Sequence, residues 1–417
     1  MKRILLIAYH FPPIRLSSGI QRTLKFAQYL PDFDWQPMVL SINPRAYPVT
    51  SNDQMAEIAP DMVVKRAFGL DSSRHLAIKG RYFNRSAMPD QYATWWFDGV
   101  RQGKKLIKQY QPDIIWSTFP IASAHNIAYS LHQASGIPWV ADFRDSMTED
   151  GYPTDPLRRQ HWLKIEKKTI AASARTVFTT AGAVAMYQQR YPDIDPKQWA
   201  LINNGFDEEN FIQAEQQWQQ NKAKPQKKLV LVHAGILYPS ERDPRAFFGA
   251  IAKLKKVRAI STEILEIRLR ATAHDELFKP MLKQYGIDDI VKLAEGVPYQ
   301  QALVEMLEAD GLLLFQAANC NHQIPAKLYE YLRAQRPIFA LTDIKGNTSQ
   351  ILTAGGVPYI VDLANEEAIQ AEFLIFIQAL QNKMAFTAST DFAQQFSRYA
   401  ATEKLAKLLD NIMSEQK

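Results

Sequence analysis

The chain has 417 residues, of which 47% are apolar and 22% are charged, and it contains one cysteine, Cys320. This composition excludes a mainly disordered chain, a collagen-like chain and a domain stapled by disulfides. No apolar run approaches the roughly 20 residues of a membrane-spanning helix. The apolar run at residues 4–8 is too short for a secretory signal. We therefore expect a cytoplasmic protein with two or three globular domains.

Positive charge is concentrated near the N-terminus. The whole chain has a net charge of +6, but residues 1–110 hold 16 Lys or Arg and 8 Asp or Glu, a net +8. Within this part, basic and apolar side chains are interleaved at residues 65–85 and 101–108. Such segments dock reversibly on anionic membranes, and a basic, freely solvated surface is the alternative. We expect a peripheral contact with the inner face of the plasma membrane and no nucleic acid partner.

In the first half, short apolar runs alternate with amphipathic stretches. Strands are predicted at residues 4–9, 37–42, 114–118, 139–143 and 176–179, and helices at residues 19–30, 122–133 and 157–173. Continuously apolar strands that are separated by helices indicate a parallel sheet with both faces covered.

The pattern restarts after residues 212–228, which are polar and rich in Gln and Lys. Strands are then predicted at residues 229–234, 263–271, 290–293, 311–315 and 338–340, and helices at residues 244–257, 275–285, 300–309, 325–334 and 348–354. The predicted fold class is α/β, with two tandem Rossmann-like, doubly wound domains that face a cleft, where ligands of such folds bind. The predicted parts are an N-terminal domain at 1–205, a linker at 206–228, a second domain at 229–390 and a helical tail at 391–417.

Several common chemistries lack their motifs. The loop after the first strand, HFPPIRLSSGIQR, contains one glycine and no G-x-G-x-x-G, and no G-x-x-x-x-G-K-[ST] occurs, so neither a dinucleotide cofactor nor a P-loop is expected. No H-E-x-x-H and no cluster of Cys and His supports a zinc site. The D-x-D triplets at residues 32–34 and 193–195 fall in turns. We expect neither a metal nor a cofactor.

Two helix starts carry groups that suit an anion. Ser17, Ser18 and Gly19 precede the first helix, where free N–H groups and the helix dipole attract a phosphate or a sugar oxygen. A simple N-cap is the alternative.

The second of these starts lies in the segment NCNHQIPAKLYEYLRAQR, residues 319–336. Pro325 suits the first turn of a helix, and Lys327 and Glu330 follow on it. A lysine at a helix start suits a diphosphate, and a glutamate one turn later can accept hydrogen bonds from two ribose hydroxyls. An ordinary surface Lys–Glu pair is the alternative.

The segment IPAKLYEYLRAQRPIFA, residues 324–340, resembles the donor-binding motif of family-4 glycosyltransferases, which have the GT-B fold. NGFD at 204–207 and HAGILYPSERDP at 233–244 resemble the same family. HFPP and SSGIQRTLKFAQYL near the N-terminus, with PWVADFRD at 138–145, resemble a branch that makes bacterial surface polysaccharides.

The resemblance implies a retaining glycosyltransferase of the EC 2.4 type that does not need a metal. It would move a sugar from a nucleotide-sugar donor to a glycan or lipid-linked acceptor. In this family the second domain binds the donor and the first binds the acceptor, and we expect the C-terminal helix to cross back to the N-terminal domain.

The resemblance also implies roles for residues of the second domain. The second glutamate of the family's Glu-x₇-Glu pattern matches Glu330, which in relatives holds the ribose hydroxyls, whereas the first falls at His322. Arg242 matches one of two basic residues that contact the diphosphate. Ile236 stands where the family often has the other, and Lys327 would compensate. We expect the base to meet the backbone of residues 296–299. The expected donor-binding residues are Gly19, Arg242, His322, Pro325, Lys327, Leu328 and Glu330.

In the first domain, many relatives have a histidine after the fourth strand, near the reacting sugar. Here that loop, STFP at residues 117–120, lacks one. His125, early in the next helix, could substitute, and an ordinary helix-surface histidine is the alternative. Asp142, Arg144 and Asp145 end the following strand and are expected to point at the cleft, with a structural Arg–Asp pair as the alternative. These four are the expected catalytic residues.

Two other functions stay open. A nucleotide-sugar epimerase of the same fold would need acid and base side chains in the cleft, and it would change a nucleotide sugar without an acceptor. A nucleotide-sugar-binding protein without transferase activity is suggested by His322 at the position of the family's first glutamate.

Overall fold

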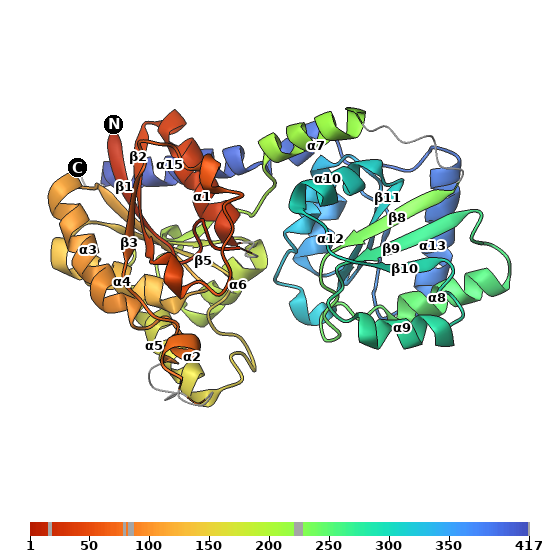
Figure 1. The fold of residues 1–417 in the computed structure, drawn as a ribbon, viewed down its shortest axis with the longest axis horizontal. Helices are drawn as coiled ribbons and strands as arrows, with labels where there is room; N and C mark the ends of the chain where they lie inside the picture. The colour runs from red at the N-terminus through yellow and green to blue at the C-terminus, as the bar shows by residue number, and fades with distance from the viewer. Residues whose placement is uncertain (16–18, 78–80, 82–86, 221–227, 416–417) are drawn as a thin grey trace. The chain divides into compact units, whose positions relative to one another are not determined.

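The computed structural model describes two compact units, each built around one parallel sheet with helices beside it (Figure 1). Unit 1 comprises Met1–Asn204 and Arg398–Lys417, and unit 2 comprises Gly205–Ser397. The described residues are 1–15, 19–77, 81, 87–220 and 228–415.

The sheet of unit 1 has seven strands in the order β3-β2-β1-β4-β5-β6-β7. Its strands are β1 Lys2–Ile7, β2 Trp35–Ile42, β3 Val63–Ala67, β4 Ile114–Thr118, β5 Trp139–Arg144, β6 Arg175–Phe178 and β7 Trp199–Leu201. The strand order reverses between β1 and β4, so their carboxyl ends flank the switch point at which doubly wound sheets bind ligands. Both strands are apolar and buried at the centre of the sheet, as continuous apolar runs predict.

Two of the longer helices of unit 1 begin after residues whose side chains accept backbone hydrogen bonds. Asp155 caps α5 by accepting from Arg158 N, with Pro156 in the first turn, and Thr180 caps α6 by accepting from Ala183 N. The helices are α1 Gly19–Tyr29, α2 Ser72–His75, α3 Trp95–Tyr110, α4 Ala122–Ser135, α5 Pro156–Ala172, α6 Ala181–Arg190 and α15 Arg398–Glu415.

Helix α15 returns to unit 1, as the resemblance predicts. Leu405 and Leu409 are fully buried in the core of this unit. The indole Nε1 of Trp35 donates to Asp410 Oδ1 at 2.9 Å, and the rings of Tyr399 and Tyr29, on α1, lie 5.5 Å apart. The predicted crossing of the C-terminal helix is therefore confirmed.

The sheet of unit 2 has six strands in the order β10-β9-β8-β11-β12-β13. Its strands are β8 Leu229–Ala234, β9 Leu265–Arg270, β10 Val291–Ala294, β11 Gly311–Gln316, β12 Ile338–Thr342 and β13 Ile360–Val361. Alternate residues of β8 face opposite ways: Leu231 joins one apolar cluster, while Val230 and Val232 join another. The sheet is therefore covered on both faces, and the predicted fold class of two tandem Rossmann-like α/β domains is confirmed.

Residues 206–228, predicted as a linker, include a helix of unit 2. In α7 Glu208–Gln220 the side chains of Phe211 and Ala214 are fully buried, and Arg333 bonds Glu208 and Glu215. Residues 221–227 lie outside the described part of the chain. The other helices of this unit are α8 Arg245–Lys256, α9 Asp275–Gln284, α10 Tyr299–Glu308, α11 Lys327–Arg333, α12 Asn347–Ala354, α13 Glu366–Gln381 and α14 Thr390–Gln394. Throughout the described ranges, every helix is too short or too polar to span a bilayer.

Candidate functional site

The turn after β8 requires glycine. Gly235 has a φ of 112°, and a Cβ at this position would lie 3.0 Å from Lys327 Nζ. The N–H of Ala234 donates to Tyr331 OH at 3.1 Å, which fixes the end of β8 against α11. Because Gly235 has no side chain, the backbone of the turn lies close to the Lys327 ammonium and leaves space for an anion.

Lys327, the first residue of α11, contacts the side chain of a buried histidine. Its Nζ lies 3.1 Å from His233 Nε2, and His233 Nδ1 lies 2.9 Å from the carbonyl oxygen of Leu313. Because a carbonyl only accepts, Nδ1 carries the imidazole proton and Nε2 accepts from the ammonium. Burial and the charge of Arg242 lower the pKa of Lys327 to about 7. Burial and the charge of Lys327 hold the pKa of His233 well below 6.5, so this imidazole is neutral.

Arg242 is anchored on the same turn. Its Nη1 donates to the carbonyl oxygen of Ile236 at 2.8 Å, and its guanidinium lies 5.3 Å from the ring centre of Tyr238. Among the described residues, neither Arg242 nor Lys327 forms an ion pair with a carboxylate. Two neighbouring cations without an ion-pair partner favour an anion at this turn, and the nearby carboxylate of Glu330 offsets only part of the lowering of the Lys327 pKa.

Glu330 lies one turn after Lys327 on α11. Its Oε1 accepts a hydrogen bond from Tyr299 OH at 2.7 Å, at the start of α10. The carboxylate is thereby held toward the loop that follows β10, the loop expected to meet the base. The structure thus brings together Lys327, Arg242 and Glu330 at one edge of the sheet of unit 2.

A pocket of about 550 Å³ lies at the carboxyl ends of β9 and β10. Ala271 and Ala273 adopt positive φ values of 54° and 61°, which turn the chain sharply around it. The pocket includes Gly296, within the segment expected to recognise the base. Its wall also contains Thr272, His274, Leu277, Ala294 and Glu295.

The remaining predicted donor residues of unit 2 lie in and beside the turn before α11. The carbonyl oxygen of Pro325 accepts from Leu328 N at 2.9 Å, so Pro325 initiates the turn as expected. Leu328 is fully buried in the core, so its side chain packs instead of facing a ligand. His322 is partly buried, with its Nε2 3.5 Å from Gln323 Nε2.

In unit 1, Asp142 is held by a buried arginine. Arg22 Nε and Nη2 donate to its two carboxylate oxygens at 2.9 and 2.8 Å, and Thr118 Oγ1 donates to Oδ2 at 2.9 Å. The exposed fractions of the Arg22 and Asp142 side chains are 1% and 0%. Asp142 therefore joins α1 to β4 and β5 instead of facing a ligand. Asp142 thus belongs to a structural Arg–Asp pair whose arginine comes from α1, and not to one with Arg144.

His125 also lies in the core of unit 1. It is fully buried, and its Nδ1 lies 2.7 Å from Ser117 Oγ, which accepts from Trp139 Nε1 at 2.8 Å. Burial lowers the pKa of His125 to about 3. It is neither a surface histidine nor one that a sugar can reach, which corrects both sequence interpretations.

Arg144, Asp145 and Gly19 meet at the carboxyl ends of β1 and β5. Arg144 Nε and Nη2 donate to Asp145 Oδ2 at 3.1 and 2.9 Å. A Cβ at Gly19 would clash with Arg144 Nη1 and would lie 3.1 Å from His10 Nδ1. Burial and the charge of Arg144 lower the pKa of His10 to about 3, so its imidazole is neutral. Ser17 and Ser18 lie outside the described residues.

Sequence reasoning missed His10 and His233. Both stand at or just after the ends of the first strands of their units, and each opens a segment that carries the family resemblance, HFPP and HAGILYPSERDP, but neither was assigned a role. Only the folded chain brings His233 to Lys327, 94 residues away, and His10 to Arg144.

Residues 23–210 match the sequence profile of Glycosyltransferase Family 4. No curated protein sequence matches the chain significantly. The match confirms the predicted family for this part of the chain and the predicted enzyme class, a glycosyltransferase.

Solved structures are similar over nearly the whole chain. Sucrose-phosphate synthase from Thermosynechococcus elongatus is 12% identical with a TM-score of 0.69, and the alignment covers 100% of both chains. HepE from Anabaena, in complex with UDP-glucose, is 13% identical with a TM-score of 0.65, covering 99% of this chain and 100% of HepE. Trehalose 6-phosphate synthase from Burkholderia multivorans is 13% identical with a TM-score of 0.67, covering 100% and 98%. At these identities the likeness establishes the fold, and the predicted GT-B fold is confirmed.

The buried pair in unit 1 gives a stability prediction. Arg22→Met should lower the free energy of unfolding by about 3–5 kcal/mol, because it leaves the buried carboxylate of Asp142 without a countercharge. Urea unfolding followed by tryptophan fluorescence measures this change. Arg101→Met, at a side chain that is 62% exposed, is the control and should cost less than about 1 kcal/mol. Equal losses for the two variants would contradict the structural role of the pair.

Proposed function

We propose that the chain transfers a sugar from a nucleotide-sugar donor to a glycan or lipid-linked acceptor, with retention of configuration, in surface polysaccharide biosynthesis. The match of residues 23–210 to the profile of Glycosyltransferase Family 4 supports this proposal. The observation that carries the proposal is the pair of cations, Lys327 and Arg242, beside the glycine turn after β8. Among the described residues neither cation forms an ion pair with a carboxylate.

In this proposal unit 2 binds the donor. Lys327 and Arg242 hold the diphosphate, since both donate charge-assisted hydrogen bonds to phosphate. Glu330, already oriented by Tyr299, accepts from the ribose hydroxyls, and the base enters the pocket that includes Gly296. HepE from Anabaena was solved with UDP-glucose, so UDP-glucose is the first donor to test.

The two cations also act on the chemical step. Departure of the nucleoside diphosphate builds negative charge on its leaving oxygen, and fixed positive groups there lower the barrier. His233 Nε2 accepts a hydrogen bond from one N–H of the Lys327 ammonium, which leaves the other two N–H groups free to donate to the phosphate.

Unit 1 offers an acceptor site at the carboxyl ends of β1 and β5, where His10, Arg144 and Gly19 meet. The neutral imidazole of His10 accepts a hydrogen bond from the attacking hydroxyl, and Arg144 attracts an anionic group of the acceptor. With a pKa of about 3, His10 is too weak a base to remove the hydroxyl proton alone. The leaving phosphate takes that proton, as in front-face attack.

A transfer assay tests the function. UDP-glucose labelled in its sugar is incubated with the full chain, with and without a membrane extract as the source of acceptors. Label should appear in a glycan or lipid fraction only when extract is present, and Lys327→Met should abolish its appearance. A chelator should leave transfer intact because Lys327 and Arg242 supply the charge. An epimer formed from the donor alone would indicate an epimerase, and binding without transfer would indicate a binding protein.

The pKa of Lys327 predicts how donor affinity depends on pH. The diphosphate of UDP-glucose does not titrate between pH 6 and 9, and His233 stays neutral there. Below pH 7 the ammonium is already formed, so affinity is level. Above pH 7 binding must take up a proton, so affinity should fall, by up to about tenfold per pH unit.

Calorimetry on two variants separates this effect from a general loss. Lys327→Met should bind weakly, with an affinity that does not change with pH. Glu330→Gln should lose about tenfold in affinity below pH 6, from one hydrogen bond to a charged group, and should still show the fall with pH, which begins at a lower pH because Glu330 raises the pKa of Lys327. A wild-type affinity that is level to pH 9 would disprove the proposed role of Lys327.

We further propose peripheral association with the inner face of the plasma membrane. Arg101, Lys104, Lys105 and Lys108 are exposed on α3, and each basic group near an anionic bilayer contributes about 1 kcal/mol. Residues 78–80 and 82–86 of the other basic segment lie outside the described residues. Co-sedimentation with phosphatidylglycerol vesicles should fall sharply between low and about 0.5 M salt. Absence of binding at low salt would exclude this membrane contact and favour a soluble acceptor.

A further inference from the structure

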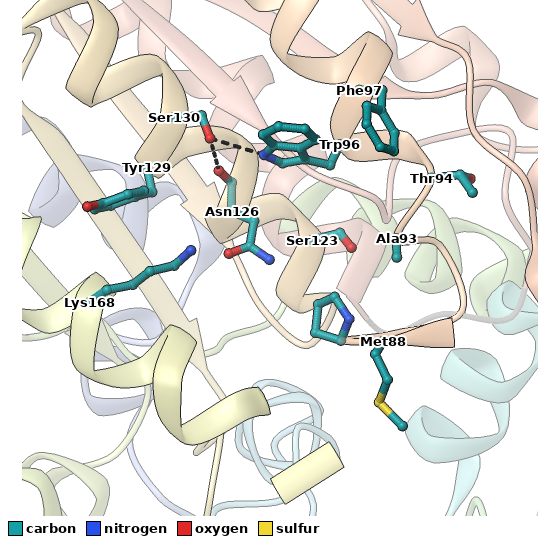
Figure 2. A pocket seen from close by; sticks show the side chains of 11 residues that line it. Met88, Ala93, Thr94, Trp96, Phe97, Ser123, Asn126, Tyr129, Ser130 and Lys168 are labelled. Carbon is teal, nitrogen blue, oxygen red and sulfur yellow. Dashed lines mark hydrogen bonds between the residues drawn. The ribbon is translucent and has the colours of Figure 1, made fainter. Parts of the chain in front are cut away.

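Unit 1 contains a pocket of about 520 Å³ between the start of α3, one face of α4 and the end of α5 (Figure 2). None of the residues assigned above to the donor or acceptor lines it. Its wall combines aromatic and polar side chains, among them Trp96, Phe97, Asn126, Tyr129, Ser130 and Lys168.

A hydrogen bond from its ring nitrogen holds the indole of Trp96 in place. Its Nε1 donates to Ser130 Oγ at 3.0 Å, and Ser130 Oγ donates to the carbonyl oxygen of Asn126 at 2.9 Å, as Figure 2 shows. The side chains of Trp96 and Phe97 are 38% and 71% exposed, and their rings lie 5.1 Å apart. Neighbouring exposed rings mark an interaction site. Because this hydrogen bond already orders the indole, packing against the C–H face of a sugar would cost little additional side-chain entropy.

Lys168 supplies a positive charge inside the pocket. Its Nζ lies 4.7 Å from the ring centre of Tyr129, and among the described residues it pairs with no carboxylate. Figure 2 shows the side chain reaching from α5 toward α4. Burial lowers the pKa of Lys168, because the charged form is poorly solvated. An anion that enters the pocket would stabilise this ammonium.

The amide of Asn126 adds an unmet hydrogen-bonding group. Its Oδ1 is buried and has no hydrogen-bond partner among the described residues. A buried amide oxygen without a donor is unfavourable, and a sugar hydroxyl can provide that donor. The pocket thus presents a ring face, a cation and an amide together.

We propose that this pocket binds an anionic sugar residue of a glycan, with the sugar ring against Trp96 and its acid group at Lys168. Either a uronate or a phosphorylated sugar has this chemistry. The pocket would hold the growing glycan at a second point on unit 1. This inference rests on the proposed function in one respect: that function supplies a glycan as the acceptor.

An anionic membrane is the other partner that exposed aromatic and basic residues attract. The pocket favours a sugar because Lys168 is half-buried in a concave wall that also offers an amide. The exposed lysines of α3, such as Lys104, do not line it. Variants at Lys168 and Lys104 therefore separate the two partners.

The test measures binding to the full chain by calorimetry in the absence of any donor. The anionic probes are a hyaluronan tetrasaccharide, which contains uronates, and glucose 6-phosphate; cellotetraose is the neutral probe. Lys168→Gln and Trp96→Ala alter the pocket, and Lys104→Gln is the matched control. Thermal unfolding confirms that the variants fold, and vesicles of phosphatidylglycerol are tested in parallel.

At least one anionic probe should bind more tightly than cellotetraose, and the probe that binds identifies the acid as a uronate or a phosphate. Lys168→Gln and Trp96→Ala should each weaken this binding by about tenfold, whereas Lys104→Gln should change it less than twofold. Failure of both anionic probes to bind, or equal affinity in wild type and Lys168→Gln, would overturn the proposal. So would a Lys168→Gln variant that lost only vesicle binding. UDP-glucose affinity, measured on the same samples, shows separately whether the donor site is intact.

Discussion

Two neighbouring cations at the end of β8, neither of them in an ion pair among the described residues, are the feature on which the function proposed for unit 2 depends. Lys327 donates to a buried, neutral imidazole and lies beside Arg242, so burial and like charge both oppose its ionisation. A fold selected only for stability would pair these cations or replace them with apolar side chains. Neither cation has an ion-pair partner in the described part of unit 2, which is the basis for proposing an anionic ligand there. Gly235 keeps space open beside Lys327 Nζ, and Tyr331 holds α11 in place.

Unit 1 shows the opposite arrangement at its buried charges. Asp142 accepts from Arg22 and Thr118, and Glu166 accepts from Thr148 and Tyr187 at 2.9 and 2.7 Å. Such groups, with partners on every side, stabilise the sheet and its helices. His10 and Lys168, the two groups of unit 1 to which a binding role is assigned above, have fewer polar partners among the described residues. His10 is neutral beside the guanidinium of Arg144, and the ring of Tyr129 is the one partner that Lys168 has among the described residues.

The sequence predicted most strands and helices because the buried strands are continuous apolar runs and the helices have clear start signals. The family resemblance also singled out Lys327, Arg242 and Glu330; the structure brings them near one another, and their roles stay predictions. It did not predict helix α7, whose few apolar side chains are hidden among Gln and Glu. Asp142 was correctly placed at a strand end, but its partner Arg22 is 120 residues away. His125 was misjudged because it follows the apolar face of α4 into the core.

In the proposed function, the Lys327 amine has a pKa of about 7 in the free protein and becomes fully protonated when a diphosphate binds. Carbon-13 NMR of lysine Cε tests it directly, with the Lys327 resonance assigned by its loss in Lys327→Met. In the free protein this resonance should titrate near pH 7, well below the ordinary lysine pKa of 10.5. With saturating UDP-glucose the midpoint should rise above about 9, since an adjacent anion favours the charged form. A midpoint near 10.5 in the free protein, or one that UDP-glucose does not move, would contradict the account.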